Sequence, residues 1–197
     1  MFDPPVVLLK KSCGGVTGDR LFTVNLSSYI ILREFPLDSR SAAQFYFAYG
    51  SNMNQARMVG RDMKIVSMTA GWLDGFGLRF NKRSRRDDNL ACANMVWARS
   101  ERIQGILYEL ESIEEIIKLD PHEGAPWRYS RELFNVQTSE AVQPAWIYVA
   151  NPAVLDDTVL PGRWYIEHLL AGRDYLTEDY WQRINNTECL ANSVEWS

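Results

Sequence analysis

The stretch FYFAYGSNMNQARM, residues 45–58, decides the fold of this 197-residue chain. Its first five residues are aromatic or small and apolar, a composition typical of a buried strand. The strand stops at Gly50, and a helix is predicted over 53–59, with Ser51 or Asn52 as its N-cap. The short segment between this strand and this helix is either a simple connection or a turn that binds a ligand.

The turn Tyr49-Gly50-Ser51-Asn52 has the chemistry of an anion site. Gly50 has no side chain at the point where the backbone must bend or approach a ligand. The first N–H groups of a helix lack intrahelical partners and lie at its positive end, where a carboxylate or a developing oxyanion can bind. A plain turn with a polar cap remains an alternative. So does Ser51 as a nucleophile served by His122 or His168, although the G-x-S-x-G spacing is absent.

Strand and helix patterns interleave along the rest of the chain. Short intervening loops favour antiparallel neighbours, which indicates an α+β protein with a mixed or closed sheet. Strands are predicted over 45–49, 77–81, 92–98, 103–110, 131–138 and 145–151, and helices over 53–59, 112–119, 163–171 and 177–184.

Composition excludes several classes of protein. Apolar residues make up 46% of the chain and charged residues 23%, as in a globular domain. The net charge of −4 argues against a dedicated nucleic-acid binder. The apolar runs are shorter than the roughly 18 to 20 residues that span a bilayer, and the N-terminus is a poor signal peptide. Three scattered cysteines without a C-x-x-C pair predict neither disulfides nor a zinc site, and a cytoplasmic protein is expected.

The chain divides into three parts by motif content. Residues 1–43 form an N-terminal extension of unknown role, in which Gly14-Gly15 could mark a hairpin. Residues 44–188 form the domain that carries the motifs. Residues 189–197 form a polar C-terminal tail.

A second motif, LDPHEGAPWRYSR, spans residues 119–131. Glu123 directly precedes Gly124, and a glutamate at a helix C-terminus opposes the helix dipole, so capping does not explain it. Apolar neighbours such as Ala125 and Trp127 would desolvate the carboxylate and raise its pKa toward the working pH, as a general base requires. An exposed loop glutamate is the alternative, and His122 is expected at the surface.

These blocks together resemble the γ-glutamylcyclotransferases of the AIG2-like superfamily. The resemblance covers about residues 44–185. The YGSN turn favours the general γ-glutamyl branch, since γ-glutamylamine cyclotransferases typically show YGTL and the glutathione-specific branch YGSL. The matching blocks, in order, are FAYGSNM, GWLDGFGLRFNKRS, CANMVWA, IQGILYEL, LDPHEG and AWIYVAN.

The resemblance implies a fold and a reaction. The fold would be a mixed, largely antiparallel sheet that closes into a small barrel with flanking short helices. In the family reaction the α-amine of a γ-glutamyl group attacks its own γ-carbonyl, which releases 5-oxoproline and an amino acid or amine. Glu123 matches the catalytic base, and the N–H groups of 49–52 would bind the substrate carboxylate and the oxyanion. A small-molecule γ-glutamyl substrate is expected, with no cofactor or metal; a homodimer is possible.

Further residues match positions near the family's site. The resemblance implies that the hydroxyls of Tyr129 and Tyr148 bind substrate or hold Glu123, unless these residues are ordinary strand aromatics. Asn81 and Asn94 are expected to contact substrate, and Ser84 and Arg57 are further candidates. The basic run at 82–86 would either attract an acidic substrate or form a solvated loop. Four tryptophans are expected in the core or around a bulky leaving group: Trp72, Trp97, Trp127 and Trp146.

Three functions remain open from the sequence. The first is a γ-glutamyl cyclotransferase. The second is a binding or regulatory module that keeps the fold without turnover. The third is a specialised cyclotransferase that acts on a natural-product intermediate. An active enzyme requires Glu123 to lie beside the 49–52 turn with room for a small ligand.

Overall fold

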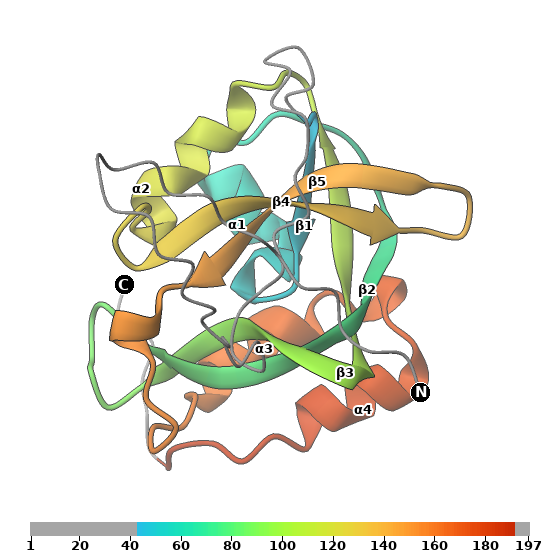
Figure 1. Ribbon diagram of the computed structural model, residues 1–197. Helices are drawn as coiled ribbons and strands as arrows, with labels where there is room; N and C mark the ends of the chain where they lie inside the picture. The colour runs from blue at the N-terminus through green and yellow to red at the C-terminus, as the bar shows by residue number, and fades with distance from the viewer. Residues whose placement is uncertain (1–42, 192–197) are drawn as a thin grey trace, which may run out of the picture. The chain divides into compact units, whose positions relative to one another are not determined.

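Five strands close into a barrel in the order β1–β3–β2–β4–β5 in the computed structural model (Figure 1). Strand β1 pairs antiparallel with β3 and parallel with β5, and the other neighbouring strands are antiparallel. The predicted mixed, largely antiparallel barrel is therefore confirmed. The strands are β1 (Phe45–Ala48), β2 (Ile65–Arg83), β3 (Ala91–Leu110), β4 (Tyr129–Gln137) and β5 (Val142–Ala150).

The structure describes residues 43–191. The hairpin suggested at Gly14-Gly15 lies outside the described residues, as does most of the C-terminal tail. The domain boundaries inferred from the sequence stay predictions.

Strands β2 and β3 are much longer than predicted. The two segments predicted at 92–98 and 103–110 are halves of one strand, β3, so five strands replace the six expected. The predicted strand at 77–81 is the end of β2, whose first half was missed. Many side chains in that first half are exposed, which leaves little hydrophobic alternation to detect. A register shift between Asp74 and Phe76 bends the pair without ending it.

Short helices flank the barrel. The helix predicted at 53–59 is instead a 3-10 turn, η2 (Ser51–Met53), followed by α1 (Gln55–Gly60). The N-cap of α1 is Asn54, whose side chain accepts a hydrogen bond from the N–H of Ala56 at 3.0 Å, and not Ser51 or Asn52. The helix predicted at 112–119 is η3 (Glu115–Leu119), which continues into α2 (Asp120–Glu123).

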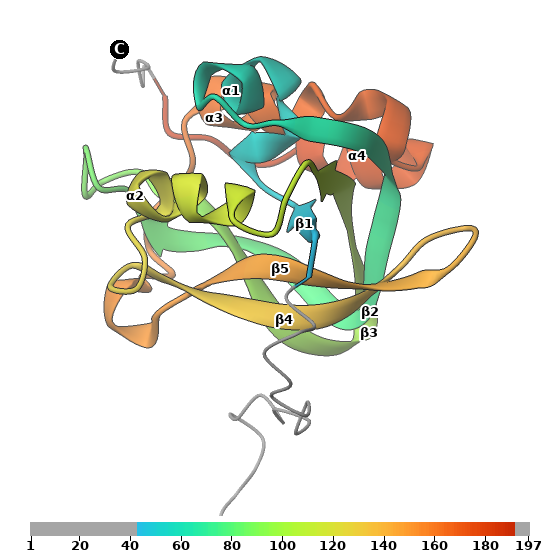
Figure 2. The same cartoon turned by 90° about the horizontal axis from the view of Figure 1, so that it is seen from above.

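The two predicted C-terminal helices are present as α3 (Arg163–Leu170) and α4 (Glu178–Asn185). Helix α3 buries Tyr165, Ile166 and Leu169, and it packs on η2. Helices α1, α3 and α4 gather on one side of the barrel, opposite the β4–β5 hairpin (Figure 2). Two further 3-10 turns are η4 (Pro152–Val154) and η5 (Arg173–Tyr175). None of the described helices is long and apolar enough to cross a membrane.

Candidate active site

Helix α2 carries Glu123 to the barrel. A proline lies in its first turn, where the missing N–H costs nothing, and Gly124 ends it in the left-handed region at φ 69°. This conformation suits a glycine and turns the chain directly after Glu123. The Tyr148 hydroxyl of β5 donates to Asp120 at 2.6 Å and so ties the start of α2 to the barrel. Glu123 therefore projects from a short helix that is fixed at both ends.

The Glu123 carboxylate is held by one of its two oxygens. Arg61 donates to Oε1 at 2.9 Å, and the Asn52 side chain donates to the same atom at 3.1 Å. Only 16% of the Glu123 side chain and 12% of the Arg61 side chain are exposed. Oε2 accepts no hydrogen bond from any residue in the described part of the chain. One oxygen is thus anchored, and the other is available to take a proton from a ligand.

Asn52 links the YGSN turn to Glu123. Its buried side chain also donates to the Tyr46 hydroxyl at 2.7 Å and accepts from Arg61 at 2.7 Å. Its backbone carbonyl accepts from Tyr108 at 2.8 Å. The sequence predicted a role for the backbone of Asn52 but missed this side-chain contact. It also missed Arg61, which belongs to no motif and lies beyond the helix that was predicted.

Gly50, Ser51 and Asn52 of the turn lie at the same cavity as Glu123. No acceptor in residues 43–191 bonds the backbone N–H of Gly50, Ser51 or Asn52. These residues and Glu123 line one small cavity of about 30 Å³. The donors lie at a helix N-terminus as expected, but the helix is the short 3-10 helix η2, which begins at Ser51, and not an α-helix, since α1 begins only at Gln55. The arrangement fits a cradle for an anion beside a carboxylate.

Five tyrosines surround this small cavity. Burial raises the pKa of each hydroxyl above its ordinary value, so all five are neutral donors. Tyr129 donates to the Ala93 carbonyl at 2.6 Å, and Tyr148 donates to Asp120. Neither hydroxyl contacts Glu123, which corrects the expectation that they hold it; both rings still line the cavity. The five are Tyr46, Tyr49, Tyr129, Tyr148 and Tyr165.

Tyr148→Phe tests the anchoring of α2. The variant removes a hydrogen bond to a charged carboxylate that also pairs with Arg131 at 3.2 Å. We expect the free energy of unfolding, measured in urea, to fall by about 1.5–3 kcal/mol. Tyr175→Phe is the control, since the Tyr175 hydroxyl makes no hydrogen bond with the described residues. Equal losses in the two variants would show that the Tyr148 bond contributes nothing.

Asn81 and Asn94 do not line either of the two cavities. Asn94 accepts from the Ala150 N–H at 3.1 Å and donates to Asn81 at 3.2 Å. Asn81 in turn donates to Asp157 at 2.7 Å. These amides join β2, β3 and β5 instead of lining a cavity, so the described contacts of Asn81 and Asn94 are structural and the expected substrate contacts stay predictions.

A second, larger cavity of about 450 Å³ adjoins the small one. The two share Ser51, Glu123, Tyr129 and Tyr165 as lining residues. Ser84 and Trp164 also line it, whereas none of the four tryptophans singled out from the sequence does. Trp97 and Trp127 are exposed, by 60% and 82%, so the expectation of core positions is wrong for both. Five basic side chains line this cavity: Arg57, Arg61, Lys82, Arg85 and Arg86.

The two histidines do not form a Ser-His pair with Ser51. His122 is exposed at the large cavity, and burial and then the Arg61 charge lower its pKa, so its imidazole is neutral near pH 7. His168 contacts Asn54 and Arg57. Within residues 43–191, no hydrogen bond joins the Ser51 hydroxyl to either histidine. The nucleophile alternative therefore lacks its base. No cluster of metal-binding side chains occurs within residues 43–191.

A comparison with protein-family models matches residues 46–166 to the family described as gamma-glutamyl cyclotransferase, AIG2-like. The chain belongs to this family. The residues matched include the YGSN turn, Arg61 and Glu123, so the family region contains the whole of the small cavity. The resemblance inferred from the sequence is confirmed. A search of curated proteins gives no match.

Solved structures share the fold. A structure titled gamma-glutamyl cyclotransferase has a TM-score of 0.67 at 19% identity and covers 79% of this chain and 94% of its own. An uncharacterized Homo sapiens protein has a TM-score of 0.68 at 19% identity, with the same coverage. A yeast gamma-glutamyl cyclotransferase specific to glutathione gives 0.52 at 10% identity, over 74% of this chain and 97% of that one. At these identities the likeness extends to the fold only.

Proposed function

We propose that this protein is an active γ-glutamyl cyclotransferase in which Glu123 is the general base. The observation that carries the proposal is that the Glu123 carboxylate, anchored through Oε1 and open at Oε2, shares a cavity with three unbonded backbone N–H groups. A base beside a set of oxyanion donors is what an amine attack on a carbonyl requires.

The proposed reaction needs no group beyond substrate and protein. The neutral α-amine attacks the γ-carbonyl carbon, and Glu123 takes a proton from the amine as the bond forms. A new C–N bond closes the five-membered lactam and gives a tetrahedral oxyanion. The oxyanion collapses, the bond to the leaving nitrogen breaks, and Glu123 returns the proton to that nitrogen. The products are 5-oxoproline and a free amine or amino acid.

The protein's contribution is positioning and charge stabilisation. The amine and the carbonyl lie on one flexible chain, so folding the γ-glutamyl group against the turn can supply several kcal/mol of the barrier. The N–H groups of Gly50, Ser51 and Asn52 offer donors for the oxyanion and for the substrate α-carboxylate. Arg61 and Asn52 keep the base in place as charge develops.

The cavities favour an enzyme over a binding module. The large cavity opens at Glu123 and has room for a leaving group, whereas a module without turnover would need neither a base nor a space beside it. The third possibility, action on a natural-product intermediate, differs from the first only in the leaving group.

Release of 5-oxoproline tests the proposal. We expect the purified chain to release 5-oxoproline from at least one γ-glutamyl amino acid or amine, measured by chromatography. The same compound with an N-acetylated α-amine should be inert, because an amide nitrogen is not nucleophilic. Free glutamate in place of 5-oxoproline would indicate a hydrolase, and turnover of the N-acetyl compound would contradict the intramolecular attack.

A further inference from the structure

Lys82 is a buried cation without a carboxylate partner. The residue is 5% exposed, although it lies in a run that suggested a solvated loop. No carboxylate in residues 43–191 forms an ion pair with it, and no described acceptor hydrogen-bonds its ammonium. Its Nζ lies 4.8 Å from the centroid of the Tyr129 ring, a residue that lines both cavities. The side chain itself lines the large cavity.

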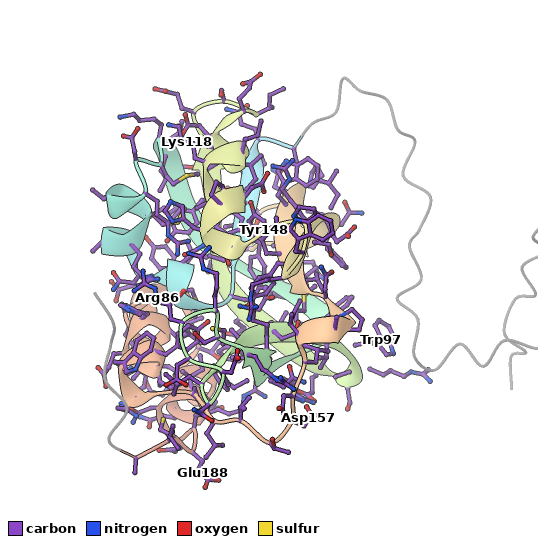
Figure 3. All side chains as sticks on the ribbon, turned by 90° about the vertical axis from the view of Figure 1, so that its left-hand side faces the viewer. Arg86, Trp97, Lys118, Tyr148, Asp157 and Glu188 are labelled. Atoms are coloured by element: carbon purple, nitrogen blue, oxygen red, sulfur yellow. The ribbon has the colours of Figure 1, made fainter. Side chains whose placement is uncertain are left out.

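A β-bulge explains why this lysine is turned inward. Strands β2 and β3 shift register between Phe80 and Lys82, and Lys82 then pairs with Cys92. An extra residue in one strand re-aims the side chains that follow it, and such bulges are frequent next to active sites. The following arginines, Arg85 and Arg86, are exposed on the loop to β3 (Figure 3). The basic run is thus split between a buried ammonium and an exposed loop.

A buried ammonium needs a compensating anion. Burying an unpaired charge is costly, and burial lowers the pKa of Lys82 from its ordinary value. The single carboxylate that lines the large cavity, Glu123, is already bound to Arg61. Because Glu123 is bound to Arg61, it does not form an ion pair with Lys82. Salt screens the exposed arginines but acts much less on Lys82.

We propose that the large cavity binds a leaving group that carries an acidic substituent in addition to any α-carboxylate, and that Lys82 makes the buried contact with it. This inference rests on the proposed function. The γ-glutamyl part would lie against the turn where the two cavities meet, at Ser51 and Glu123, and the leaving amine would extend past Glu123 into the larger one. The anionic substituent can be a carboxylate or a phosphate, since both satisfy an ammonium. Lys82 is then a specificity-determining residue.

Two pairs of substrates test the proposal. γ-Glutamyl-glutamate and γ-glutamyl-glutamine are nearly isosteric and keep the same α-carboxylate, so they differ in one negative charge. We expect the wild-type protein to prefer the glutamate compound by about tenfold or more in kcat/KM. γ-Glutamyl-phosphoserine and γ-glutamyl-serine form the second pair. Whichever pair shows the larger ratio identifies the anion as carboxylate or phosphate.

Lys82→Met assigns the preference to this side chain. The variant keeps an unbranched apolar chain over Tyr129, so the preference should fall to about one while kcat/KM for the neutral substrates changes less than about threefold. Lys64→Met is the control, because Lys64 is exposed and lines neither cavity. A purely structural role of Lys82 would lower kcat/KM for acidic and neutral substrates alike, and that result would overturn the proposal.

The kcat/KM ratios of the wild-type protein test the inference even if Lys82→Met does not fold. Absence of any preference for an acidic leaving group contradicts it. Failure of the proposed function is distinguished by unreactive ligands. Glutaryl-glutamate and glutaryl-glutamine lack the α-amine, and calorimetry measures their binding without turnover. If no γ-glutamyl compound yields 5-oxoproline, the proposed function fails. Lys82-dependent preference for glutaryl-glutamate then still supports the anion site, and equal affinities refute it.

Discussion

Replacing Glu123 with glutamine is expected to lower the rate of 5-oxoproline release by about 10²–10⁴-fold, the usual loss when a general base is removed. The geometry makes this a clean substitution. Arg61 and Asn52 both donate to Oε1, and the glutamine carbonyl can accept the same two hydrogen bonds. Only Oε2 changes, from a proton acceptor to an NH₂ group. The fold should therefore persist while the acceptor is lost.

Three measurements complete this test. The rate is followed as 5-oxoproline release, binding is measured with the substrate analogues that lack an α-amine, and stability is measured by urea unfolding. Glu111→Gln is the control, since Glu111 is exposed and its side chain contacts neither cavity. We expect Glu123→Gln to bind the analogues with an affinity near that of the wild type. A rate within about tenfold of the wild type would exclude Glu123 as the base.

The sequence predicted the turn and the glutamate of the site because each is recognised from residues that are adjacent in the chain. A glycine between an aromatic strand and a polar helix start marks the turn, and a glutamate before a glycine marks the end of α2. Local chemistry is enough to find such features. It does not show that Asn52 contacts Glu123, because the two lie 71 residues apart and meet only when the barrel closes.

The residues that were missed depend on long-range geometry. Arg61 follows α1 and reaches Glu123 only because α1 packs beside η2. Lys82 looks solvated in a run of basic residues, and only the bulge between β2 and β3 shows that it turns inward. The six predicted strands became five for a related reason. A bend inside a long strand exposes polar residues such as Arg99 and Ser100, which in the sequence resemble a loop.

Gly50→Val is expected to lower activity by at least about 10²-fold, comparable to the loss of an oxyanion donor. The reason lies in the space beside the turn, since φ at Gly50 is −121° and a left-handed backbone is not required. A Cβ at this position would lie 3.1 Å from the Ala93 Cβ and 3.4 Å from the Tyr165 hydroxyl. Both neighbours line the small cavity, so the two valine methyl groups must displace them or fill it.

The loss of activity in Gly50→Val is to be compared with the loss of stability in the same variant. Overpacking of this kind costs about 1–3 kcal/mol in the free energy of unfolding, which most folded domains tolerate. The loss of activity, measured where the variant is fully folded, should therefore be larger than partial unfolding can explain. Ala98→Val is the control: it adds methyl groups to β3 at a position that lines neither cavity.

Gly50→Ala supplies an intermediate step if the valine variant does not fold. It places a single methyl group in the tight space beside Ala93. We expect the rise in KM, expressed as a free energy, to exceed the fall in the free energy of unfolding. If both variants keep activity within about tenfold of the wild type while folding normally, the N–H groups of the turn do not bind the reacting group. The break in the chain at Gly50 would then serve the fold alone, and the donors for the oxyanion would have to come from other groups of the cavity, since the hydroxyls of Tyr49, Tyr129 and Tyr148 already donate to acceptors in the protein.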